Sequence, residues 1–260
     1  MIFGNIQNNS TGKGWVLFAK PSFVIAWVMW FNSTIFYWST FTMIHIQKCV
    51  AACLTAAVLC TATAALAFDE SPEVIKQRIG TGDPVAGKTR SELCQGCHGE
   101  FGLSQEDLIP NLAGQYAPYI GKQLRNFQSG ARTHQIMNAM AKTIDDAELI
   151  DIAAYFSSQK KMQGNGKGDN PVAKNLFTKG DSARGIPPCM SCHGVNGKGQ
   201  APNVATYPVI GGQHKGYLRT QLIHWRSGER SNSPDGVMNK VAKSLTDNEI
   251  ESLTDYISGL

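Results

Sequence analysis

The same five-residue spacing occurs twice in this chain, at Cys94-Gln95-Gly96-Cys97-His98 and at Cys189-Met190-Ser191-Cys192-His193. This CxxCH spacing is typical of c-type heme attachment. Two thiols three positions apart can each form a thioether with one vinyl group of the same porphyrin, and the next residue brings an imidazole to the iron. We therefore predict two covalently attached heme c groups, with His98 and His193 as axial ligands of the iron.

Two other kinds of site match parts of the sequence and are less favoured. Four cysteines in CxxC pairs could hold zinc, but zinc gives no reason for a histidine to follow each pair. The segment Gly82–Thr89 matches the phosphate-loop pattern GxxxxGK[ST], yet no buried strand precedes it. Asp83-Pro84 is instead typical of a helix start. We therefore expect neither zinc nor a nucleotide, and no nucleic-acid partner.

The chain from Asp83 onward is a tandem repeat. Segments that recur in register are Asp83–Ala86 with Asn170–Ala173, Leu112–Gln115 with Ile210–Gln213, and Met137-Asn138 with Met238-Asn239. Both halves are therefore expected to share one fold. We predict a first domain over residues 68–163, a glycine-rich linker over 164–169 and a second domain over 170–260.

Each half is predicted to be helical. Apolar side chains recur at helical spacing at Ile120/Leu124/Phe127 and Leu218/Leu222/Trp225, and again at Leu149/Ile152/Phe156 and Ile250/Leu253/Ile257. Capping boxes at 145–148 and 246–249 begin the last helix of each half. No convincing alternating strand pattern occurs. The predicted fold class is all-α, with two domains that each wrap around one heme.

The sixth ligand of each iron is predicted from the repeat. Candidates downstream of the motifs are His134, Met137 and Met140 in the first half and His214, His224 and Met238 in the second. Only Met137 and Met238 recur in register, since Met140 aligns with Val241 and no histidine has a histidine counterpart. Ligation by His and Met raises the reduction potential and leaves no open position for a substrate. This favours electron transfer over catalysis, so we do not expect an enzyme.

A ligating imidazole usually donates its other N–H to a carbonyl group. Pro110 and Pro208 occupy matching places between each motif and the first long helix. We predict that these two residues supply that carbonyl, behind His98 and His193.

The first 68 residues contain no Asp or Glu and differ from the rest of the chain. Met43–Lys48 is typical of a basic n-region, Val50–Leu59 of an apolar core and Ala65–Ala67 of a cleavage site. We interpret residues 43–67 as a signal peptide, residues 1–42 as an upstream extension from a wrong start, and Phe68 as near the mature start. A membrane anchor at about residues 16–46 is the alternative, and a lipoprotein cysteine at Cys53 is weaker.

With these motifs, prolines, glutamines and methionines, the chain from about Asp83 to Leu260 resembles the diheme cytochrome c4 family. The resemblance implies two class I cytochrome c domains that face each other, with heme propionates near the interface. It also implies a periplasmic or membrane-associated carrier that takes electrons from an upstream cytochrome complex or a small donor of the respiratory chain and delivers them to a terminal oxidase. Two alternatives are a diheme electron-accepting subunit of a flavocytochrome c sulfide dehydrogenase and a diheme peroxidase. Two in-register methionines argue against the peroxidase.

The two halves also differ in charge. Residues 69–163 contain 10 basic and 12 acidic residues, a net charge of −2, whereas residues 164–260 contain 11 and 8, a net charge of +3. Surface charge steers the approach of a partner protein. We therefore expect the two domains to dock different redox partners.

Overall fold

The computed structural model describes residues 73, 78, 80–200 and 207–260. The predicted upstream extension, signal peptide and mature start, and the alternative anchor and lipoprotein cysteine, lie outside these residues. The chain from Glu70 to Leu260 forms one compact unit that contains both halves of the repeat. Within the described part of the chain, no helix combines the length and the apolar character that crossing a membrane requires.

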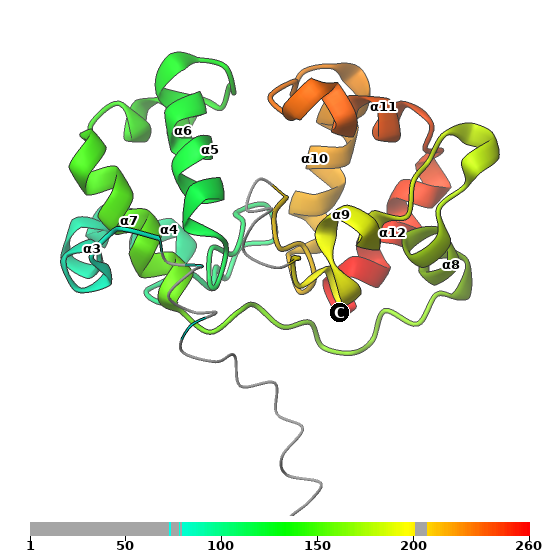
Figure 1. Cartoon of the computed structure of the whole chain (residues 1–260), viewed down its shortest axis with the longest axis horizontal. Coiled ribbons are helices and arrows are strands. Elements are labelled where there is room, and N and C mark those ends of the chain that lie inside the picture. The colour runs from blue at the N-terminus through cyan, green and yellow to red at the C-terminus, as the bar shows by residue number, and fades with distance from the viewer. Residues whose placement is uncertain (1–72, 74–77, 79, 201–206) are drawn as a thin grey trace, which may run out of the picture. The chain divides into compact units, whose positions relative to one another are not determined.

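Helices joined by loops make up both halves (Figure 1). The first half contains α3 (Pro84–Arg90), α4 (Glu92–His98), α5 (Ala117–Ser129), α6 (Gln135–Ala141) and α7 (Asp146–Ser158). The second half contains α8 (Pro171–Lys179), α9 (Cys189–His193), α10 (Lys215–Ser227), α11 (Val237–Lys243) and α12 (Asp247–Gly259), with 3-10 turns at Ser182–Arg184, Val195–Gly197 and Pro234–Gly236. Among the described residues the β-structure is limited to an isolated bridge between Asp181 and Ile186. The prediction of an all-α fold is confirmed.

The helix starts follow from local sequence. The side chains of Asp83 and Asn170 accept backbone N–H groups at the starts of α3 and α8, each with a proline at the first helical position. Both predicted capping boxes are present, at Asp145 of α7 and Thr246 of α12. These caps satisfy N–H groups that would otherwise lack a partner, and so they fix where the helices begin.

The predicted apolar stripes form the core of each half. In the first half, Ile120, Leu124 and Phe127 of α5 pack with Leu149, Ile152 and Phe156 of α7. In the second half, Leu218 of α10 packs with Ile250, Leu253 and Ile257 of α12, and Leu222 is partly buried against them. The apolar stripes of α5 and α10 also border the cavity described below.

Gly87, in the segment that matches a phosphate loop, has a packing role. It is buried where α3 crosses α7, and a Cβ atom at this position would overlap the backbone carbonyl of Asp151. The glycine therefore allows two helices to approach closely, and the segment lies in a helix rather than in a loop that could cradle phosphate.

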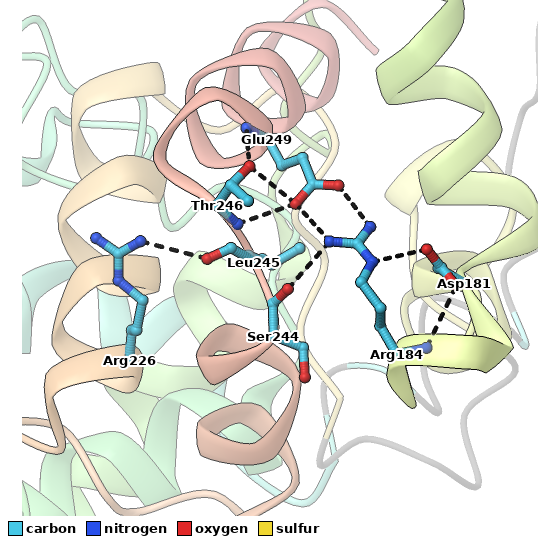
Figure 2. Close-up of polar contacts among 7 residues, drawn as sticks. All are labelled: Asp181, Arg184, Arg226, Ser244, Leu245, Thr246 and Glu249. Atoms are coloured by element: carbon cyan, nitrogen blue, oxygen red, sulfur yellow. Dashed lines mark hydrogen bonds and ion pairs between the residues drawn. The ribbon is translucent and has the colours of Figure 1, made fainter.

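The start of α12 is held by a bidentate ion pair (Figure 2). Arg184 donates to Glu249 with both terminal nitrogens, at 2.9 and 2.6 Å, and with Nε to Asp181 at 2.7 Å. Glu249 also accepts the backbone N–H of Thr246 at 2.9 Å. Hydrogen bonding to Arg184 is the largest cause that lowers the pKa of Glu249, to about 2. The carboxylate thus ties the turn after α8 to the capping box.

The segment predicted as a linker, 164–169, packs on the end of α12. The N–H of Gly164 donates to the carbonyl of Leu260 at 2.6 Å, and the N–H of Gly166 donates to Gly259 at 2.9 Å. A Cβ atom at Gly168 would crowd the backbone of Tyr256. The glycines therefore let this segment lie against the helix.

Candidate functional site

The CxxCH motifs lie on two short helices. Cys94, Cys97 and His98 end α4, and the second motif forms α9. Residues three apart lie on one face of a helix, so each cysteine pair faces the same side. Both imidazoles are buried, with His98 7% and His193 8% exposed.

The two histidines have matching partners. Nδ1 of His98 lies 2.8 Å from the carbonyl oxygen of Pro110, and Nδ1 of His193 lies 2.9 Å from that of Pro208. Burial lowers the pKa of both imidazoles, which favours the neutral form that binds metals. An imidazole held at Nδ1 presents Nε2 to a metal.

One cavity of about 760 Å³ is bordered by all of the predicted heme residues. They are Cys94, Cys97, His98, Pro110, Met137, Cys189, Cys192, His193, Pro208 and Met238. The remaining wall is largely apolar and includes the α5 and α10 stripes. Paired thiols, a neutral imidazole and a thioether around an apolar space are the donor set and the surroundings that a c-type heme needs, so the residues fit the group.

Methionines enter this cavity from α6 and α11. Both Met137 and Met140 border it, so the cavity leaves either one as a candidate ligand, and the repeat favours Met137 because Met238 is its counterpart. His134 caps α6, and its Nδ1 accepts the N–H of Met137 at 3.3 Å. Nε2 of His224 lies 3.3 Å from a carboxylate oxygen of Glu229.

The sequence reasoning did not identify the residues that anchor these methionine helices. Nδ2 of Asn138 donates to the carbonyls of Phe127 at 2.5 Å and Arg132 at 3.0 Å. Nδ2 of Asn239 donates in the same way to Trp225 and Arg230, at 2.7 and 2.8 Å. In the sequence, an Asn follows each in-register methionine, and this recurrence was the one indication that these residues have a shared role.

A cluster of cationic side chains lies where the halves meet. Arg132 donates to the hydroxyl of Tyr217 at 3.1 Å and to Gln221 at 2.9 Å, and Arg230 donates to Tyr119 at 3.2 Å. Both arginines border the cavity.

The charges of this cluster act on a neighbouring lysine. Burial, followed by the nearby charges of Arg230 and Arg132, lowers the pKa of Lys122. Arg132 and Arg230 give this side of the cavity a positive charge, which suits carboxylates.

The cytochrome c family model matches the chain twice, at residues 85–160 and 173–260. Cytochrome c4 from Thiocapsa roseopersicina is 37% identical over 183 residues, which cover 69% of this chain and 93% of that protein. The crystal structure of reduced recombinant cytochrome c4 from Pseudomonas stutzeri has a TM-score of 0.63 and 36% identity, and covers 69% of this chain and 99% of its own. A thiosulfate dehydrogenase electron acceptor from Stutzerimonas stutzeri is 33% identical, over 64% of this chain and 78% of that protein.

These matches confirm several predictions. Two class I cytochrome c domains account for the all-α fold. Each carries one CxxCH motif, so the cofactors are two covalently bound heme c groups. The protein is an electron-transfer protein rather than an enzyme. The chain belongs to the diheme cytochrome c4 family.

Proposed function

We propose that the protein carries electrons in the periplasm, from an upstream cytochrome complex or small donor of the respiratory chain to a terminal oxidase. The observation that carries the proposal is the single cavity bordered by both motifs and by both in-register methionines. When bound, each heme supplies a one-electron iron couple. Two such couples beside one cavity suit the entry of an electron in one half and its exit from the other.

The proposed ligands are His98 with Met137 and His193 with Met238. The carbonyls of Pro110 and Pro208 orient the imidazoles through the Nδ1 contacts, and the four cysteines hold the porphyrins. The cationic cluster of Arg132 and Arg230 supports placing the propionates at the boundary between the halves. The domain limits 68–163 and 170–260 belong to the same proposal.

We infer from the charge difference that the two halves dock different partners. The first half carries −2 and the second +3 over the ranges counted above. Electrostatic steering raises an association rate at low salt and loses effect as the salt screens it. Raising the salt should therefore change electron transfer with a given charged partner in opposite directions for the two hemes. The same direction for both hemes would contradict the inference.

A second candidate, as electron acceptor of a dehydrogenase for sulfur compounds, is favoured by the relative named thiosulfate dehydrogenase electron acceptor. The more specific alternative, a subunit of a flavocytochrome c sulfide dehydrogenase, stays a prediction. The two roles differ in what reduces the protein and whether it forms a stable complex.

Rapid mixing can separate these roles. The oxidised protein is mixed with purified thiosulfate dehydrogenase and thiosulfate, and the reduced protein with membranes that contain a terminal oxidase. The carrier role predicts fast oxidation by the membranes that a specific oxidase inhibitor abolishes. Fast reduction by the dehydrogenase, without oxidation by the membranes, would favour the second candidate.

A further inference from the structure

The two halves are joined by a reciprocal pair of glutamines, Gln115 and Gln213. Oε1 of Gln213 accepts the backbone N–H of Asn111 at 2.8 Å, and its Nε2 donates to the carbonyl of Asn111 at 2.9 Å. Gln115 does the same to Val209, at 3.0 and 2.9 Å. Each glutamine thus binds both backbone groups of one residue in the opposite half. Both glutamine side chains are buried, at 4% exposed.

The bound residues lie directly after Pro110 and Pro208. The N–H of Asn111 belongs to the same peptide group as the carbonyl of Pro110, which faces Nδ1 of His98. The N–H of Val209 likewise shares its peptide group with the carbonyl of Pro208, which faces His193. One continuous chain of hydrogen bonds therefore runs from each imidazole, through one peptide group, to a glutamine of the other half.

A peptide group transmits polarisation because its C–N bond has partial double-bond character. When its N–H donates to an acceptor, its carbonyl oxygen becomes a better acceptor, and such chains strengthen each bond by about 10–30%. A stronger acceptor at Nδ1 makes the imidazole a stronger electron donor to a metal. A more donating ligand stabilises oxidised iron and lowers the reduction potential.

We propose that Gln115 and Gln213 are positioning residues that tune the heme of the opposite half. Gln213, in the second half, acts on the iron bound by His98, and Gln115, in the first half, acts on the iron bound by His193. The inference rests on these histidines being the iron ligands. Each chain of hydrogen bonds crosses between the halves. Separation of the halves would therefore remove the effect of the glutamines on the reduction potentials, as well as the contact between the domains.

The test replaces each glutamine in the full, heme-loaded protein by leucine, which keeps volume but removes the acceptor. Gln213→Leu should shift the ratio of reduced to oxidised iron at the His98 site toward the reduced form, by about two- to threefold at fixed potential. At 59 mV per tenfold, this is a rise of about 20–30 mV. The His193 site should stay unchanged, and Gln115→Leu should give the reverse pattern.

Redox titration followed by NMR can report each site separately, through the methyl signal of its axial methionine in the reduced protein. Gln213→Glu keeps an acceptor oxygen beside Asn111, so it should not raise the potential of the His98 site, and this variant answers the question if Gln213→Leu fails to fold. A shift confined to the heme of the mutated half, an equal shift at both hemes, or no shift at either would overturn the proposal. Absence of axial methionine signals from the unmodified protein would instead contradict the ligands proposed above.

Discussion

Substitution of Asn239 by alanine should weaken the proposed bond between Met238 and the heme iron without removing either proposed ligand. Nδ2 of Asn239 ties α11 to the carbonyls of Trp225 and Arg230, where α10 ends, at 2.7 and 2.8 Å. Each hydrogen bond is worth about 0.5–1.5 kcal/mol net, so the loss of both costs about 1–3 kcal/mol. If α11 must leave this position for the methionine to detach, the detached population rises about 5–150-fold.

Added imidazole measures this population, because it binds the iron only where the methionine has left. The apparent affinity for imidazole at the His193 site should rise by the same factor, about 5–150-fold. The charge-transfer band between methionine and iron reports the displacement. Asn175→Ala, an exposed position on α8, is the matched control and should leave the affinity unchanged. A change of less than about twofold in Asn239→Ala, with the helical circular dichroism intact, would show that Asn239 does not hold Met238 in place.

Three further predictions concern stability. Gly87→Ala should destabilise the protein by about 1–3 kcal/mol in chemical denaturation, because the new Cβ overlaps the carbonyl of Asp151. Val85→Ala, on the exposed side of the same helix, should be near neutral. Equal effects of the two substitutions would contradict the packing role of Gly87. Glu249 has a lowered pKa of about 2 in the folded protein, against about 4.3 when unfolded, so its contribution is complete above pH 4.3 and is lost as the pH falls toward 2. The melting temperatures of the unmodified protein and Glu249→Gln should therefore differ at neutral pH and converge toward pH 2, and a constant difference would exclude this linkage. Gly168→Asn should lower the melting temperature because its side chain would crowd the backbone of Tyr256. Gly166→Asn is the control, since open space surrounds this position and Asn tolerates its positive φ, and it should cost less. The reverse order would argue against packing of this segment on α12.

Much of the fold could be predicted because its signals are local. The side chains of Asp83 and Asn170 cap helices within three residues of themselves, and the stripe at Ile250, Leu253 and Ile257 needs only the helical period. The CxxCH motif is equally local, since its chemistry requires five consecutive residues.

Contacts between distant segments could not be predicted in the same way. Gln115 and Gln213 recur in register, which marks them as shared by both halves, but the register does not show that each reaches across to the other half. The role of Gly87 likewise depends on where α7 passes α3. Such contacts depend on how helices pack within a half and on how the two halves pack together, which neither the helical period nor the register of the repeat specifies.

We propose two irons with both axial positions filled, one by His98 and Met137 and the other by His193 and Met238. The most direct test is intact mass with absorption spectroscopy on the heme-loaded protein and on Met137→Ala, Met238→Ala and Met140→Ala. We expect two covalent hemes in each protein, loss of about half of the methionine-to-iron band in Met137→Ala and Met238→Ala, and a full band in Met140→Ala. Loss of half of the band in Met140→Ala, with Met137→Ala unaffected, would contradict it.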